Sequence, residues 1–211
     1  MRPRAERLSI EALAGPAAIL AGTCWLIWVA VNYFSGNLSP TEAPRLTKLV
    51  QVLTAGWNLF LIPAAIVLYR RLKWQGNDPA MVLTSCGIIS LLFWAYGGAS
   101  NTITPGAEVV YLILSGIWWL GVGYLLMTSH RYFAVFTMVL GSFTLLDALL
   151  SFLEPMPFYV YALAAPKLPL SIIWDFYLGY WLIKEYRFQL RTIPPSPTSP
   201  DFSADPRRIL A

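Results

Sequence analysis

The chain has 211 residues, of which 57% are hydrophobic and only 12% charged, with a net charge of +4. A water-soluble domain carries about twice that share of charged residues, because its surface has to be solvated. The mean hydropathy of +0.57 therefore excludes a soluble globular domain and predicts an integral membrane protein.

Six apolar runs are long enough to cross a bilayer, since about 20 helical residues at ~1.5 Å rise cover ~30 Å of hydrocarbon. None shows the polar stripe at 3.6-residue spacing that is typical of a helix in a soluble bundle. We therefore predict an all-α fold, a polytopic transmembrane helical bundle of about six spans. The predicted spans are 12–34, 49–69, 80–100, 108–128, 132–152 and 158–183.

The rest of the chain is divided around one transmembrane domain, predicted over 12–187. Residues 1–11 are predicted to be a cytoplasmic N-terminus. Residues 188–211 hold five prolines among Ser, Thr and Asp, which predicts a disordered cytoplasmic tail. Four prolines in 154–169 leave open whether 158–166 belongs to the sixth span or lies in the membrane interface.

The basic residues are distributed unevenly between the two sides of the predicted spans. Twelve of the 15 Lys and Arg residues fall on the side of both termini, and Arg45, Lys48 and Lys167 fall on the other. Cytoplasmic segments are enriched in Lys and Arg, so both termini are predicted to be cytoplasmic and the protein to lie in the cell membrane. The positive charge then requires no nucleic-acid partner, and the predicted partner is the lipid bilayer.

The first predicted span carries small residues at four-residue spacing, Ala14, Ala18 and Gly22. Small side chains let two helix backbones approach closely, and such packing is a main source of helix association in lipid. This ridge is predicted to be a helix-packing face, either within the bundle or between subunits.

The fourth and sixth spans share the pattern S-x-I-W-x4-G-Y-x-L, beginning at Ser115 and at Ser171, and Gly56-Trp-Asn is a fainter copy in the second. All three spans run in the same direction, which is consistent with a repeated two-helix unit. The alternative is coincidence in a Trp- and Gly-rich alphabet. If the repeat is real, Asn58, Trp119 and Asp175 are equivalent positions facing a shared space. Trp57, Trp118, Trp119 and Trp174 are candidates for an apolar ligand pocket, the alternative being ordinary packing.

Ionisable side chains inside a bilayer are costly and therefore point to function. The candidate polar sites are Asp147, Asp175, Glu108 and Glu154, together with the uncharged Asn58. Asp147 is predicted to lie about 10 Å nearer the outer surface than Asp175, which disfavours a pair sharing a proton. Glu108, Asp147 and Glu154 together could form an outer acidic vestibule for a cation or proton, the alternative being carboxylates held by nearby hydroxyl groups.

Several kinds of site are absent from the sequence. The single histidine, His130, falls in a short loop where it is predicted to be solvated, so no haem, di-iron or zinc site is expected. No phosphate-binding or nucleophile-elbow motif occurs. Lys167 lies near the outer edge between prolines, where a Schiff base is not expected. No catalytic residues, metal or cofactor are predicted.

Parts of three spans resemble a group of small six-span bacterial membrane proteins, known only as a domain of unknown function. The similar segments are Leu49-Val-Gln-Val-Leu, Leu61-Ile-Pro-Ala-Ala, Leu68-Tyr-Arg-Arg-Leu, Trp118-Trp-Leu-Gly-Val-Gly-Tyr-Leu-Leu and, after Trp174, Gly179-Tyr-Trp-Leu-Ile. The resemblance implies the same six-span architecture and brings no catalytic residues.

These observations favour a non-enzymatic bundle that binds an apolar ligand, a lipid or a partner membrane protein. One alternative is a small proton- or cation-coupled carrier that uses Asp147. Another is a membrane-embedded acid–base enzyme acting on a lipid or isoprenoid through Asp175.

Overall fold

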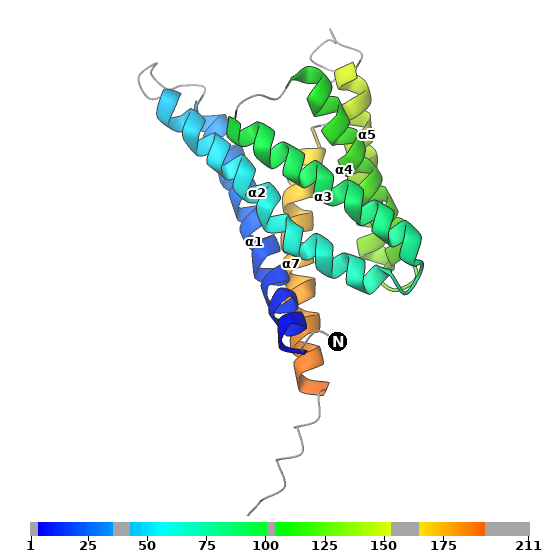
Figure 1. The fold of residues 1–211 in the computed structure, drawn as a ribbon. Coiled ribbons are helices and arrows are strands. Elements are labelled where there is room, and N and C mark those ends of the chain that lie inside the picture. The colour runs from blue at the N-terminus through cyan, green and yellow to red at the C-terminus, as the bar shows by residue number, and fades with distance from the viewer. Residues whose placement is uncertain (1–3, 36–42, 101–103, 153–164, 193–211) are drawn as a thin grey trace, which may run out of the picture.

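Six helices make up the described part of the chain, residues 4–35, 43–100, 104–152 and 165–192 of the computed structural model (Figure 1). They are α1 (Arg4–Ser35), α2 (Ala43–Leu72), α3 (Asn77–Ser100), α4 (Pro105–Leu126), α5 (Arg131–Phe152) and α7 (Lys167–Thr192). The predicted all-α class is confirmed. A helix satisfies its backbone hydrogen bonds within itself, which is what a chain in hydrocarbon requires.

Five helices, α1 to α5, are long and apolar enough to cross a membrane by length and composition. Their outward faces carry large apolar side chains; Val52, for example, is 68% exposed, and Val82 and Ile89 are also exposed. In water such surfaces would drive aggregation, whereas lipid tails solvate them. The chain is a multi-pass membrane protein, and these five helices are embedded in a lipid bilayer.

The last helix differs from the predicted sixth span of 158–183. α7 begins at Lys167 and ends at Thr192, and it is not among the five apolar candidates because its final third is rich in charge. Residues 153–164, which include Glu154 and most of the uncertain 158–166 segment, lie outside the described residues. The disordered tail was predicted to begin at residue 188, but residues 188–192 are helical. Arg191 in the last turn interacts favourably with the negative end of the helix dipole.

The other helices begin earlier than the hydropathy pattern predicts. α1 starts at Arg4, so most of the predicted N-terminal segment 1–11 is helical, and α2 extends beyond 49–69 at both ends. Hydropathy marks only the part of a helix that matches the hydrocarbon. The helix itself continues past that boundary, because each further turn satisfies backbone groups that would otherwise need water.

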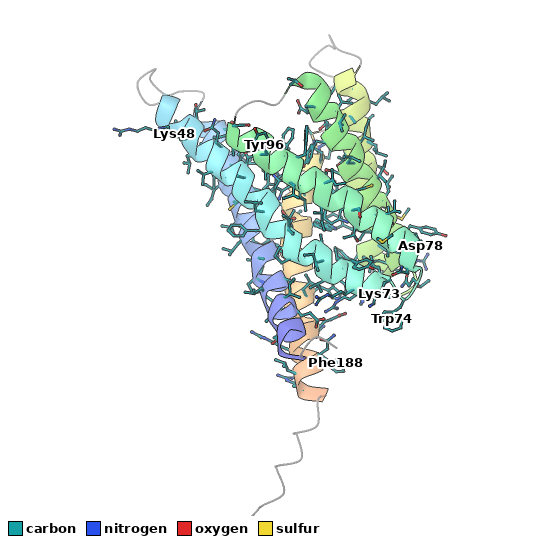
Figure 2. All side chains as sticks on the ribbon, viewed as in Figure 1. Lys48, Lys73, Trp74, Asp78, Tyr96 and Phe188 are labelled. Carbon is teal, nitrogen blue, oxygen red and sulfur yellow. The ribbon has the colours of Figure 1, made fainter. Side chains whose placement is uncertain are left out.

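Successive helices run in alternating directions, so that α1 begins and α7 ends at the same end of the bundle (Figure 1). We call this the terminal end and the opposite one the distal end. Figure 2 shows Lys73, Trp74 and Asp78 at the α2–α3 turn at the terminal end, with Phe188 beyond them. Lys48 lies at the distal end.

Neighbouring helices come closest to one another at glycine residues. α1 packs against α2 and α7, and α4 packs against α5. A Cβ atom on Gly15 would lie 2.9 Å from the carbonyl oxygen of Gly179, so the α1 and α7 backbones are almost in contact. In the predicted ridge, Ala14 and Ala18 are completely buried, and a Cβ on Gly22 would lie 3.1 Å from the Cβ of Asp175. The ridge therefore packs inside the bundle.

Candidate functional site

A cavity of about 350 Å³ lies in the distal half of the bundle, lined by residues from all six helices. Its walls are mainly aromatic and apolar, with hydroxyl groups between them, as in ordinary small-molecule sites. Five tryptophans line it: Trp25, Trp28, Trp57, Trp94 and Trp119.

The aromatic rings of the cavity form two stacks. The ring centroid of Trp25 lies 4.5 Å from that of Trp28 and 4.5 Å from that of Trp57, with interplanar angles of 24° and 14°. Trp94 and Tyr111 form the second stack, 4.3 Å apart at 19°. Near-parallel rings at these distances are a favoured aromatic arrangement. One stack joins α1 to α2 and the other joins α3 to α4.

Two of the indoles are held by hydrogen bonds to α7. Trp25 Nε1 donates to Ser171 Oγ over 2.7 Å, and Trp57 Nε1 donates to Asp175 Oδ2 over 2.8 Å. Both bonds are buried, so water does not compete for them. They fix the orientation of both rings, and because both N–H groups already donate to α7, neither is available to a molecule in the cavity.

Trp119 is the contrasting case. Its side chain is 4% exposed and lines the cavity, but its Nε1 has no hydrogen-bond partner among the residues that the structure describes. The Nε1 atoms of Trp118 and Trp181 are in the same state, and because the Trp119 Nε1 atom is itself buried, the side chain does not offer this donor to the cavity.

An ion pair stands beside the cavity. Lys167 Nζ donates to Asp147 Oδ2, and each of these side chains is 19% exposed. Lys167 lines the cavity together with Glu108. The sequence predicts no site at Lys167 and groups Asp147 with Glu108 and Glu154. The structure gives Asp147 a basic partner and places Glu108 at the same cavity, while Glu154 lies outside the described residues.

Asp175 occupies a different place from Asp147. It is completely buried, it does not line the cavity, and it supports the cavity only through Trp57. Its Oδ1 has no partner within the described part of the chain. The two aspartates thus have separate partners, Lys167 and Trp57.

The four tryptophans that were candidates for an apolar pocket lie in two different places. Trp57 and Trp119 line the cavity, whereas Trp118 and Trp174 do not. Trp174 packs edge-on against Trp118 and Trp119 at 6.0 and 5.9 Å, and its Nε1 donates to Thr137 Oγ1 over 2.9 Å. These two rings belong to the packed core because their side chains pack against neighbouring helices and do not reach the cavity.

Asn58, the third member of the predicted equivalent positions, is also completely buried and does not line the cavity. Its Nδ2 donates to the Thr54 backbone oxygen over 2.7 Å. Of Asn58, Trp119 and Asp175, Trp119 alone faces the cavity, so the shared central space predicted from the repeat is not formed by these three side chains.

Sequence reasoning missed much of the cavity wall, namely Trp25, Trp28, Trp94, Tyr111 and Lys167. Trp25 and Trp28 are three residues apart and therefore share a helix face, a signal that was present in the sequence. The meeting of Trp94 with Tyr111 depends on how α3 and α4 are rotated about their axes, for which the sequence holds no signal.

A polar cluster ties the helices together at the terminal end. Arg71 forms an ion pair with Glu185, and its guanidinium lies 5.2 Å from the centroid of the Trp181 ring. His130 Nε2 lies 3.5 Å from Glu185 Oε1, and the imidazole packs edge-on against Trp181 at 4.9 Å. The His130 side chain is 38% exposed, so it keeps contact with solvent while it also meets Glu185 and Trp181. Burial, and then the charge of Arg71, lower the pKa of His130 below its ordinary value.

Within the described residues, no three His, Cys, Asp or Glu side chains come close enough together to hold a metal ion. No family model matches the chain, and no curated protein or solved structure matches it.

Proposed function

We propose that this membrane protein binds a small apolar molecule in the cavity of the distal half and does not convert it chemically. The observation that carries the proposal is the convergence of five tryptophans on one cavity of about 350 Å³. This volume is at the small end of the range of ligand sites, so the part of the ligand that enters is small.

The preorganisation of the walls supports the same proposal. The hydrogen bonds of Trp25 to Ser171 and of Trp57 to Asp175 hold two rings in place without a ligand. A site whose side chains are already ordered loses little conformational entropy on binding, so more of the interaction energy appears as affinity. Ordinary core packing would need no such fixed rings around a cavity.

We further propose that α7 is the sixth span, that both termini are cytoplasmic, and that the cavity opens toward the outer half of the membrane. The twelve-to-three division of basic residues supports this orientation, and the alternating helix directions bring the start of α1 and the end of α7 to one side (Figure 1). Membership of the six-span group of unknown function belongs to the same proposal. Two fusion proteins test the orientation, one with a fluorescent protein and one with alkaline phosphatase at the C-terminus. The first fusion should be fluorescent and the second should lack phosphatase activity. The opposite result would overturn the orientation.

Filling the cavity tests ligand binding. Gln51 lines the cavity, whereas its neighbour Val52 faces outward. Gln51→Trp should therefore remove copurifying ligand, and Val52→Trp should leave it in place, as measured by native mass spectrometry from gentle detergent. Equal occupancy in both variants, or no bound molecule in the unmodified protein, would overturn the proposal.

A second candidate, the proton- or cation-coupled carrier, is favoured by one observation, the ion pair of Asp147 and Lys167 beside the cavity. In a carrier, protonation of Asp147 would release Lys167 and change the charge of the cavity wall. The enzyme hypothesis on Asp175 has no comparable support, because this carboxyl is buried behind Trp57. Unchanged lipid turnover in an Asp175→Asn variant would contradict the enzyme hypothesis.

A further inference from the structure

One side of α7 stays exposed along most of the helix and changes in character along its length. Its first half carries exposed apolar and aromatic side chains, and its last turns carry exposed basic ones. At 3.6 residues per turn, all six positions fall within roughly 80° of one another around the helix axis. We call them the exposed stripe of α7: Ile173, Tyr177, Tyr180, Lys184, Arg187 and Arg191.

The length of the stripe matches one leaflet of a bilayer. From Ile173 to Arg187 the helix rises about 21 Å, which is half of the ~40–45 Å that a bilayer measures with its headgroups. Tyr180 lies where the apolar part meets the basic part, at the level of the membrane interface that tyrosine favours. A lipid lying along the stripe would therefore find apolar side chains beside its acyl chains and basic ones beside its headgroup.

The basic end of the stripe has charge to offer. A shallow hollow of about 490 Å³ lies there, and the described residues that line it all belong to α7. They are Tyr180, Ile183, Lys184, Arg187, Phe188 and Arg191. None of the three basic side chains forms an ion pair with another described residue, because the nearby Glu185 is paired with Arg71 instead.

This arrangement favours an anionic lipid over the other possible occupants. A small soluble anion would use the basic end alone and leave the apolar part of the stripe without a role. A zwitterionic lipid would bring its own ammonium group to a site that already holds three cations. Near a membrane surface, each Lys or Arg strengthens the attraction to anionic lipid by roughly fivefold.

We propose that the exposed stripe of α7 is a binding site for an anionic phospholipid. The acyl chains lie along Ile173, Tyr177 and Tyr180, and the phosphate lies among the three basic side chains that follow. This inference goes beyond the ligand of the distal cavity. It rests on one part of the proposed function, the assignment of α7 as the sixth span.

Competition between two lipids with identical acyl chains tests the site. Full-length protein in detergent is incubated with equal amounts of anionic phosphatidylglycerol and zwitterionic phosphatidylcholine, and native mass spectrometry measures the preference. Arg187→Gln combined with Arg191→Gln removes two charges from the stripe. Lys73→Gln combined with Arg131→Gln is the matched control, because it removes two exposed charges at the same end of the bundle but outside the stripe.

The unmodified protein should prefer phosphatidylglycerol, and the Arg187 and Arg191 glutamine variant should lose roughly tenfold or more of that preference. The control variant should keep it. Equal losses in the two variants, no loss in either, or no preference in the unmodified protein would overturn the proposal. Arg187→Lys combined with Arg191→Lys retains the charge and should retain the preference, and a loss as large as with glutamine would overturn the electrostatic basis.

Two further comparisons locate the lipid. Glycerophosphoglycerol, the same headgroup without acyl chains, should not displace phosphatidylglycerol at equal concentration, and displacement would overturn the role of the apolar part. Gln51→Trp, which fills the distal cavity, should leave the preference unchanged, and a loss there would move the lipid to the cavity and overturn the site on α7.

The proposed function can fail separately from this inference. If no molecule copurifies in the distal cavity, the preference for phosphatidylglycerol is still expected at α7. An active alkaline phosphatase fusion would remove α7 as a span, whereas a failed inference leaves the fusion inactive and the lipid preference absent.

Discussion

The indole Nε1 of Trp57 donates a 2.8 Å hydrogen bond to the Oδ2 atom of Asp175, joining residues 118 positions apart in the chain. Both side chains are buried. The bond connects α2 to α7 and holds one ring of the cavity wall. It also accounts for an acidic side chain in an apolar helix, because the carboxyl group has a buried donor to accept from.

Breaking this pair on one side should be costly. Trp57→Phe leaves the Asp175 carboxyl buried without its donor, and we expect the free energy of unfolding to fall by about 1–3 kcal/mol. Combining Trp57→Phe with Asp175→Leu removes both polar partners and should recover most of that loss. Thermal or denaturant unfolding in detergent measures the effect, and strictly additive losses would show that the two residues do not interact.

The ion pair of Asp147 with Lys167 gives a second prediction. Asp147→Asn leaves Lys167 partly buried without its counter-charge, which should destabilise the protein by on the order of 1 kcal/mol, less than for a fully buried pair because both side chains retain some exposure. The exchanged pair, Asp147→Lys with Lys167→Asp, should restore part of the loss. The same Asp147→Asn protein in proteoliposomes tests the carrier hypothesis, which requires proton- or cation-driven flux to disappear.

The close contact of α1 with α7 predicts that Gly179 will not tolerate a larger residue. A Cβ at Gly179 would lie 2.8 Å from the backbone oxygen of Gly15, so Gly179→Ala should force the helices apart at a cost of about 1–3 kcal/mol. Gly106 is the control, because a Cβ there would meet nothing within 4 Å. Melting temperatures in detergent should fall for Gly179→Ala and stay within error or rise for Gly106→Ala.

His130 predicts a pH dependence at the terminal end. Its neighbours are Arg71, Glu185 and the Trp181 ring, and burial followed by Arg71 lowers its pKa in the folded state. The unfolded chain, with an ordinary His pKa of about 6.5, therefore binds a proton more readily than the folded protein. This contribution to stability is present above the unfolded pKa and is lost as the pH falls through the folded value.

We accordingly expect the melting temperature to decrease on acidification from pH 7 to pH 5, and part of that decrease to be absent in His130→Gln. An identical pH profile for His130→Gln and the unmodified protein would show that other groups govern the dependence. Lys73, which lies at the same end but contacts the exposed ring of Trp74, offers a neutral control as Lys73→Gln.

The sequence by itself determined the fold class and the membrane location. Long apolar runs with 12% charge cannot form a soluble surface, and a chain in hydrocarbon must satisfy its backbone within each segment, so helices follow directly. It also marked Asp147 and Asp175 as unusual, because a carboxyl group inside an apolar span is costly to bury however the helices pack.

Only the tertiary structure decided which side chains meet. Trp118 and Trp119 are adjacent in a helix that is apolar on every face, yet Trp119 lines the cavity and Trp118 is packed in the core. The hydropathy of such a helix carries no period that distinguishes the inward face from the lipid face, so its rotation is set by contacts with its neighbours. For the same reason the pairing of Lys167 with Asp147, and of Trp57 with Asp175, became visible only when the helices were placed side by side.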